Sequence, residues 1–271
     1  MKVSVLMPTY NHAATIAQAI DSFLLQTIAD ECELLISDDA STDSTARIAQ
    51  EYARRFPDRI RVLVKACNEG LLANYRSVIE MANGTYYAIL ESDDYWTDSR
   101  KLEKQVAFLE AHPDYGLSFT RWQSCKKGVL EDAADVSDIV IAHQADLYDY
   151  MLLRSIIYSP TVVFRSDLYR QYCCLDDYIR QGFVTFDYQV WLSLAAHSRI
   201  HYLPEITAVY RISDTSLSNS GNLRKRLHFE KGIEKIRAYV AGLYGYGRVG
   251  KTAVRLRELL VRLRIVWRAL F

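Results

Sequence analysis

The stretch Ala88-Ile-Leu-Glu-Ser-Asp-Asp-Tyr-Trp96 places an apolar strand directly in front of three acidic residues. The strand begins near Thr85, and Glu91, Asp93 and Asp94 follow it within four residues. Carboxylates this close repel one another, and a divalent cation that prefers oxygen ligands relieves the repulsion. Because such an ion commonly holds a phosphate as well as the protein, the stretch predicts a metal–nucleotide site with Mn²⁺ or Mg²⁺ as the cofactor.

Apolar runs alternate with helical patterns on both sides of this stretch. The runs are apolar on both faces, which is typical of strands buried between two layers of helices. The alternation predicts an α/β fold with a mostly parallel central sheet covered by helices. We expect strands at 2–7, 33–37, 61–64 and 86–90, and helices at 12–26, 42–55 and 71–82.

Three polar clusters come directly after three of these strands: Pro8-Thr-Tyr-Asn11, Asp38-Asp39 and the acids from Glu91 to Asp94. Ligands of parallel sheets bind outside the carboxyl ends of the strands, so the clusters are expected to meet at one site. One carboxylate of the Asp38-Asp39 pair would accept a hydrogen bond from a uracil N–H or a ribose hydroxyl. The alternative is that this pair only begins a helix, although Ser41 or Thr42 could cap that helix alone.

The second half of the chain is less regular. We expect helices at 100–111 and 188–196, strands at 116–120, 161–164 and 207–211, and a polar, irregular segment at 123–143 that forms a hairpin or an excursion. The predicted domain organisation is a catalytic domain at 1–221 and a basic helical extension at 222–271. Within the catalytic domain, 1–98 would be the nucleotide-binding half and 99–221 the acceptor-binding half.

The C-terminal extension is strongly basic although the whole chain has no net charge. From Asn222 onward it holds thirteen Lys and Arg against three Glu. Arginines beside an apolar helical stripe can reach anionic lipid headgroups, so we expect contact with a membrane surface. The alternatives are a helix docked on the catalytic domain or on a second subunit in a homodimer, and nucleic acid is not expected because only one aromatic residue lies among the charges. The stripe consists of Leu256, Leu259, Leu260, Leu263, Trp267 and Leu270, flanked by Arg255, Arg262, Arg257, Arg264 and Arg268.

The cysteines and the hydropathy of the chain indicate where in the cell the protein is located. The five cysteines form no CxxC pair, and the start Met1-Lys-Val-Ser4 does not resemble a signal peptide. No apolar run reaches the ~18–20 residues that span a bilayer. We expect a cytoplasmic protein, peripheral on the cytoplasmic face of the inner membrane.

Three motifs together resemble a known family. Val3-Ser-Val-Leu-Met-Pro-Thr-Tyr-Asn11, Ser37-Asp-Asp-Ala-Ser-Thr-Asp43 and Glu91-Ser-Asp-Asp94 are similar to those of the family 2 inverting glycosyltransferases of the GT-A fold. The run from Glu91 to Leu109 resembles a bacterial branch that assembles surface polysaccharides. The resemblance extends from residue 3 to about 218 and implies a three-layer α/β/α GT-A fold.

The resemblance implies an inverting, metal-dependent hexosyl or hexosaminyl transfer. The donor would be a nucleotide diphosphate-sugar, usually a UDP-sugar, and the acceptor a hydroxyl of a glycan or lipid-linked glycan in surface polysaccharide or lipopolysaccharide synthesis. Asp94 would be the chief metal ligand and Asp93 would face the metal and the ribose or sugar. The implied donor-binding residues are Pro8, Thr9, Tyr10, Asn11, Asp38, Asp39, Arg76 and Asp93.

The resemblance also nominates a general base. Phe186-Asp-Tyr-Gln-Val-Trp191 matches the family's helix-opening Asp, which makes Asp187 the residue that deprotonates the acceptor. A position at a helix start favours the ionised carboxylate. Asp187 could instead simply cap its helix, and Asp176 and Asp177 are weaker candidates for the base.

The chain departs from the family pattern at three places: Glu91 replaces the first Asp of the acidic motif, Ser213 replaces a His, and Tyr75-Arg76 replaces Arg-Asn. Arg211 could substitute for the His, and Arg76 could reach a phosphate. These departures keep open an alternative, a weak or inactive member that serves as a nucleotide-sugar-binding or scaffolding subunit. A sugar-1-phosphate nucleotidyltransferase is disfavoured, since Pro8 to Asn11 is not a Gly-rich phosphate loop.

Overall fold

The computed structural model describes residues 1–212 and 222–270, with side chains as far as Trp267. Its strands are β1 Val3–Thr9, β2 Cys32–Asp38, β3 Ile60–Val64, β4 Tyr86–Ile89, β5 Tyr95–Trp96, β6 Tyr115–Lys126, β7 Val129–Asp132, β8 Val163–Arg165 and β9 Arg199–Ile212. Its helices are α1 Ile16–Leu24, α2 Thr45–Arg55, α3 Leu71–Met81, α4 Lys101–Ala111, α5 Ser137–Ala142, α6 Leu147–Leu153, α7 Ser166–Tyr172, α8 Leu175–Gln181, α9 Asp187–His197, α10 Leu223–Tyr244 and α11 Gly250–Leu270. These elements confirm the predicted α/β fold.

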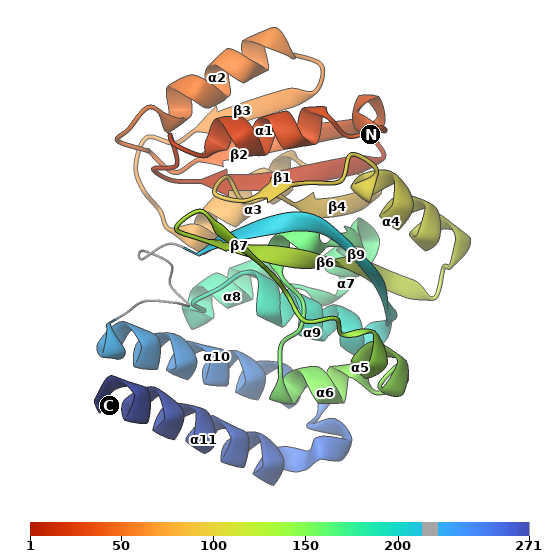
Figure 1. Ribbon diagram of the computed structural model, residues 1–271, viewed down its shortest axis with the longest axis vertical. Coiled ribbons are helices and arrows are strands. Elements are labelled where there is room, and N and C mark those ends of the chain that lie inside the picture. The colour runs from red at the N-terminus through yellow and green to blue at the C-terminus, as the bar shows by residue number, and fades with distance from the viewer. Residues whose placement is uncertain (213–221, 271) are drawn as a thin grey trace.

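The strands form one central sheet in the order β3-β2-β1-β4-β8-β6-β9-β5, with β7 paired to β6 (Figure 1). The first four strands in this order are parallel, as predicted, while β8 runs antiparallel to both β4 and β6. Thr9 pairs with Asp38, and the N–H of Leu90 donates to the carbonyl oxygen of Leu6. The carboxyl ends of β1, β2 and β4 therefore meet at one edge of the sheet.

Alternation along the strands produces two cores, one on each face of the sheet. Val5 of β1 packs in a core with Phe23 of α1, while its neighbour Leu6 packs in the other core with Val78 of α3. Side chains of a strand point alternately to opposite faces, so a strand that is apolar throughout needs helices on both sides. The result is the three-layer α/β/α arrangement.

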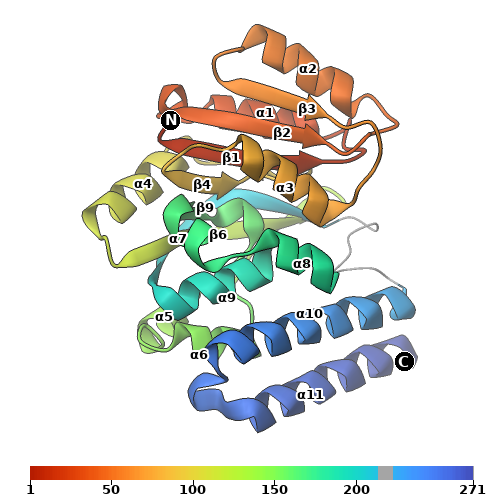
Figure 2. The ribbon, with the colours of Figure 1, turned by 180° about the vertical axis from the view of Figure 1, so that it is seen from behind.

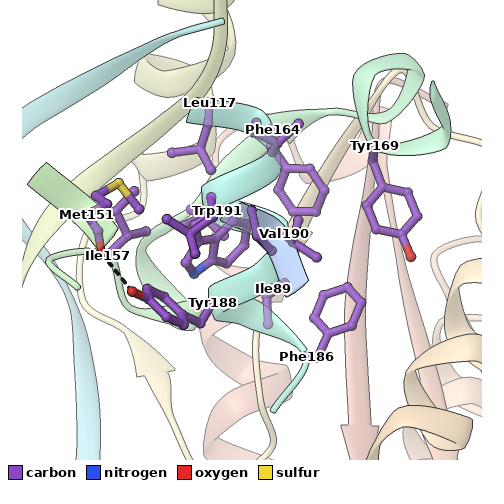
Figure 3. Close-up of a cluster of buried hydrophobic side chains, with 14 of the residues drawn as sticks. Ile89, Leu117, Met151, Ile157, Phe164, Tyr169, Phe186, Tyr188, Val190 and Trp191 are labelled. Atoms are coloured by element: carbon purple, nitrogen blue, oxygen red, sulfur yellow. Dashed lines mark hydrogen bonds between the residues drawn. The ribbon is translucent and has the colours of Figure 1, made fainter. Parts of the chain in front are cut away.

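The second half of the chain fills the core beneath β8 and β6. Figure 3 shows Trp191 and Val190 of α9 among Leu117, Phe164 and Met151. Strands β6 and β9 extend well beyond the predicted strands at 116–120 and 207–211, because they pair with each other over most of their length. The segment 123–143 consists of the end of β6, the paired strand β7 and α5, which confirms the predicted hairpin.

Helices α10 and α11 form a hairpin at the end of the molecule opposite α2 (Figures 1 and 2). Ile236 and Val240 of α10 are buried in the core that also contains Trp191 of α9. The connection, Gly245–Gly250, matches GxGxxG in sequence but joins two helices and follows no strand. A Cβ at Gly247 would lie 1.6 Å from Oδ1 of Asp149, so this glycine permits a close packing contact. The predicted domain boundary at 221/222 adjoins residues outside the described part.

Helix α11 has two apolar faces, one buried and one exposed. Val254 and Ile265 are buried, whereas the predicted stripe of Leu256, Leu259, Leu260, Leu263 and Trp267 is 52–62% exposed. Two predicted flanks of the stripe are wrong: Arg262 bonds Glu234 of α10, and Arg257 lies at its helix's inner side near Glu230. Arg255 and Arg264 remain exposed, and the side chains of Arg268 and Leu270 lie outside the described set. None of the helices in the described ranges has an apolar run long enough to cross a bilayer.

Candidate active site

An acidic cluster lies where β4 ends. Glu91, Asp93 and Asp94 can each place one carboxylate oxygen within 4.8 Å of the others. Asp94 is fully buried, and its Oδ1 accepts a 2.7 Å hydrogen bond from the backbone N–H of Arg211. Its Oδ2 is buried with no hydrogen-bond partner among the residues described. Burial, followed by the charges of Asp93 and Glu91, raises the pKa of Asp94 well above its usual range.

The side chain of Glu91 lies next to helix α3. There the hydroxyl of Tyr75 donates a 2.8 Å hydrogen bond to Oε1 of Glu91. Burial and the charge of Asp93 raise the pKa of Glu91 to about 8. Tyr75, at the place where the family pattern has Arg, therefore holds Glu91 in the cluster.

The cluster fits a divalent cation. An orphaned, buried carboxylate oxygen on Asp94 next to the carboxylate of Asp93 is a donor set that Mn²⁺ and Mg²⁺ prefer. The raised pKa of Asp94 has the same cause, since uncompensated negative charge in a buried place disfavours the ionised form. Arg211 offsets this charge only in part, because its guanidinium donates to the carbonyl oxygen of Asp93 and to Gln18.

The loop after β1 is held by the loop after β2. The side-chain oxygen of Asn11 accepts from the backbone N–H of Thr42 at 2.8 Å, and the N–H of Asn11 donates to Ser41 at 2.8 Å. Asn11 has φ 57°, a left-handed conformation that Asn tolerates better than most residues. This contact fixes the turn that presents Pro8, Thr9 and Tyr10, all of which line the cavity described below.

Asp38 and Asp39 both accept hydrogen bonds from backbone groups. Oδ2 of Asp38 accepts from the N–H of Ser41 at 2.9 Å, and its buried Oδ1 has no partner in the described structure. The two oxygens of Asp39 accept from the N–H groups of Glu69 and Gly70 at 3.0 and 2.8 Å. Asp39 lines the cavity and Asp38 lies behind it. Asp39 thus organises the loop before α3 and Asp38 the loop after β2, functions beyond the predicted base contact.

Not every predicted residue reaches the site. Arg76 lies on the outer side of α3, where its guanidinium is 3.4 Å from Asp176 and 3.9 Å from Glu80. It is outside the set of described residues that line the cavity, so the expected phosphate contact has no support in the geometry. Ser213 lies outside the described residues.

Asp187 begins α9 and is half-buried. Its Oδ1 accepts from the backbone N–H of Tyr188 at 2.7 Å and from the hydroxyl of Thr185, and its Oδ2 accepts from Ser159 at 3.4 Å. Burial outweighs these hydrogen bonds and raises the pKa of Asp187 above its usual value. The backbone N–H at the helix start lowers the pKa of Asp187, as the sequence predicts, and the larger effect of burial outweighs it.

These groups line one cavity of about 780 Å³. Tyr75 connects its two sides, since its hydroxyl bonds Glu91 and its ring stacks on Phe186 with centroids 3.9 Å apart. Phe186 directly precedes Asp187, so Glu91 and Asp93 of the acidic cluster share the cavity with the half-buried Asp187, whereas Asp94 is not one of the described lining residues. The cavity is lined by Pro8, Thr9, Tyr10, Asp39, Tyr75, Glu91, Asp93, Asp187 and others, and continues to Arg154, Arg237 and Arg257.

Several lining residues were not found from the sequence. The ring of His12 bonds Ser92 at 2.7 Å, and Ser92 donates to Thr9 at 2.6 Å, which ties the β1 loop to the acidic motif. Arg237 and Arg257 come from α10 and α11, elements with no motif. His12 follows the Pro8–Asn11 cluster directly and could have been included with it, whereas the arginines carried no such signal.

Comparisons of the sequence agree with this geometry. The sequence model of the family described as Glycosyl transferase family 2 matches residues 4–166. An uncharacterised protein of Mycobacterium tuberculosis is 35% identical over 230 residues, which is 84% of this chain and 64% of that protein. The chain thus spans just under two thirds of that relative's length.

Two further relatives match along most of their own length. TuaG of Bacillus subtilis, named as a teichuronic acid biosynthesis glycosyltransferase, is 30% identical over 258 residues, 94% of this chain and 97% of TuaG. WfgD of Escherichia coli, a UDP-Glc:alpha-D-GlcNAc-diphosphoundecaprenol beta-1,3-glucosyltransferase, is 28% identical over 220 residues, 80% of each chain.

Solved structures share the fold. The mannosyltransferase PcManGT of Pyrobaculum calidifontis, in complex with GDP-Man and Mn²⁺, superposes with a TM-score of 0.67 at 19% identity, over 99% of this chain and 72% of PcManGT. Residues 1–349 of TarS of S. aureus, in complex with UDP-GlcNAc, give a TM-score of 0.63 at 17% identity, over 98% of this chain and 79% of that one. Both similarities concern the fold.

Proposed function

The chain belongs to glycosyl transferase family 2, and on this premise we propose that it is an inverting, metal-dependent glycosyltransferase of surface polysaccharide synthesis. Its donor would be a nucleotide diphosphate-sugar and its acceptor a hydroxyl of a glycan or lipid-linked glycan. The observation that carries the proposal is the shared cavity: Glu91 and Asp93 of the acidic cluster and the half-buried Asp187 line one space, and Asp94 adjoins the first two within the cluster.

This arrangement suits displacement with inversion at the sugar. Oxygen of the acceptor hydroxyl would form a bond to C1 as the bond from C1 to the diphosphate oxygen breaks, and the nucleoside diphosphate would leave with that electron pair. Asp187 would take the hydroxyl proton. A base with a raised pKa holds a proton better than an ordinary Asp, and burial raises the pKa of Asp187 in this way.

The donor would lie along the edge where β1, β2 and β4 end. Asp93 and Asp94 would hold Mn²⁺ or Mg²⁺, which when bound would stabilise the negative charge of the departing diphosphate. Pro8, Thr9 and Tyr10 would contact the nucleotide, with Asn11, Asp38 and Asp39 fixing their loops. The name of WfgD, which specifies UDP-Glc, supports a UDP-sugar.

Thermal shift with a panel of UDP-, GDP- and dTDP-sugars tests the donor site. With Mn²⁺ and one donor at a hundred times its dissociation constant, we expect Tm to rise by about 5–10 °C. EDTA should remove most of that shift. A folded sample that responds to no donor would contradict the proposed site, whereas tight donor binding without transfer to any acceptor extract would favour the scaffolding alternative.

We also propose that the exposed stripe of α11 rests on an anionic membrane surface. Leu256, Leu260 and Leu263 are each 57% exposed, with Arg255 and Arg264 exposed beside them. Such a stripe can bury its leucines at the headgroup boundary while the arginines meet anionic lipids. The excess of ten positive charges after residue 221 favours this occupant over the same basic extension of a second copy, which it would repel.

Vesicle sedimentation measures this contact. Changing Leu260 and Leu263 together to Glu should weaken binding to phosphatidylglycerol-rich vesicles at least about tenfold, since each leucine is worth about 1.5–3 kcal/mol when buried. The control is Leu243→Glu, at an equally exposed leucine of α10. Unchanged vesicle binding would refute the membrane contact, as would a wild-type dimer that the double variant dissociates.

A further inference from the structure

Two arginines from the C-terminal hairpin line the end of the cavity beyond Asp187. Arg237 of α10 is 2% exposed, and Arg257 of α11 contributes a buried Nη1. The Nη1 atoms of both arginines are buried and, within the described ranges, have no hydrogen-bond partner. The exposed Arg154 is a third arginine that lines the cavity.

The acidic neighbours of these arginines compensate them poorly. Nη1 of Arg237 is 4.0 Å from Glu258, and Nη1 of Arg257 is 3.9 Å from Glu230, both at the limit of an ion pair. Burial and the charge of Arg237 lower the pKa of Arg257. Buried cations that lack close, well-oriented partners are costly, and an anion between them would relieve both.

The position of Arg237 relates this end of the cavity to the proposed base. Its Nε donates a 3.0 Å hydrogen bond to the hydroxyl of Tyr188, the residue after Asp187, and that hydroxyl donates to the carbonyl oxygen of Met151 at 2.7 Å. Figure 3 shows the second of these bonds. The guanidinium of Arg237 is thereby oriented by α9, the helix that begins with Asp187, and lies on the base's side of the cavity.

We infer that Arg237 and Arg257, with Arg154 at the rim, form a subsite for a phosphate or diphosphate group of the acceptor. The inference rests on the proposed function, because the donor's diphosphate is assigned to the acidic cluster and a second anion site beside Asp187 then belongs to the other substrate. Guanidinium groups match phosphate oxygens with paired hydrogen bonds, whereas a neutral sugar would leave the charges uncompensated. The acceptor phosphate could come from a lipid-linked diphosphate or from a monophosphate within a glycan.

Calorimetric titration with octyl diphosphate, octyl phosphate and octyl glucoside tests the subsite, with EDTA present so that no metal bridges the ligand. We expect the wild-type chain to bind a phosphorylated ligand and Arg257→Gln to weaken that binding about ten- to a hundredfold. The matched control, Lys251→Gln, removes one exposed charge from the same helix and should have no effect. Preference for the diphosphate would indicate a lipid-diphosphate acceptor, and preference for the monophosphate a phosphorylated glycan.

Arg237→Gln provides a second test, with its melting curve as the check on folding. Binding that survives both arginine substitutions, or no binding of either phosphorylated ligand by folded wild type, would overturn the subsite. Donor thermal shift on the same samples separates the two proposals. If the donor shift persists while the phosphorylated ligands fail to bind, only the subsite is wrong, and if both are lost the proposed function fails with it.

Discussion

Asp187→Asn is expected to lower kcat by about 10²–10⁴-fold, the range that a positioned general base contributes. The substitution is nearly isosteric, and an Asn side-chain oxygen can still accept the 2.7 Å hydrogen bond from the N–H of Tyr188. What it removes is the capacity to accept the acceptor's proton. Donor binding, measured by the Mn²⁺-dependent thermal shift, should therefore stay close to that of the wild type while turnover collapses.

A substitution at a second Asp serves as the control for this experiment. Asp177, the weaker candidate from the sequence, pairs with Arg180 on α8 and is not one of the described residues that line the cavity. Asp177→Asn should leave kcat within about twofold, as surface changes away from a site usually do little. If Asp177→Asn and Asp187→Asn lowered kcat equally, or if Asp187→Asn retained wild-type turnover, the assignment of the base would fail.

The pH dependence of kcat for the wild type also tests whether Asp187 is the base. The base must be ionised to accept a proton, so kcat should fall as pH drops through the pKa of Asp187 in the donor complex. Because burial raises that pKa, the acidic limb should lie at higher pH than for an ordinary Asp. An acidic limb at the usual pKa of a free Asp would contradict the burial described here.

Much of the donor half was predictable from the sequence for a physical reason. Strands apolar on both faces require a buried parallel sheet, and the carboxyl ends of such strands share an edge. That reasoning predicts that Thr9, Asp39 and Asp93 lie together, and all three line the cavity. The predicted phosphate contact of Arg76 is not supported, because a residue of a helix reaches the site only from the side of the helix that faces it. The guanidinium of Arg76 lies on another side, next to Asp176.

The other end of the cavity could not be predicted, because it depends on how α10 and α11 pack. Helix α11 carries two apolar faces, one with Val254 and Ile265 and one with the exposed leucines, and periodicity alone does not say which of them is buried. Once the first face packs on α10, Arg257 turns inward and leaves the stripe that the sequence assigned to it. The contacts of Tyr75 could not be predicted either, because its hydrogen bond to Glu91 and its stacking on Phe186 join segments that are far apart in the chain.

Asp94→Asn is expected to abolish the Mn²⁺-dependent donor shift and to lower kcat/KM at least about 10³-fold, since the carboxylates that bind the metal are needed for its electrostatic stabilisation of the leaving group. Asp94 offers the orphaned Oδ2, and an amide in its place is a much weaker ligand for a hard cation. Titrating Mn²⁺ at fixed donor concentration, with Tm and initial rate as readouts, measures both effects. Asp98→Asn is the control, because Asp98 follows the same motif but pairs with Lys104.

The same variant should behave in the opposite way without metal. Burial and like charges raise the folded-state pKa of Asp94, so the stability that this group contributes is complete below its unfolded-state pKa and is lost as pH rises towards neutrality. An Asn side chain does not titrate and avoids this loss, so at neutral pH Asp94→Asn should raise the Tm of the metal-free protein by about 2–4 °C for each 1 kcal/mol recovered. A gain in metal-free Tm together with a lost Mn²⁺ response separates a ligand from a structural residue, because a carboxylate retained only for packing would lower Tm in both states when replaced.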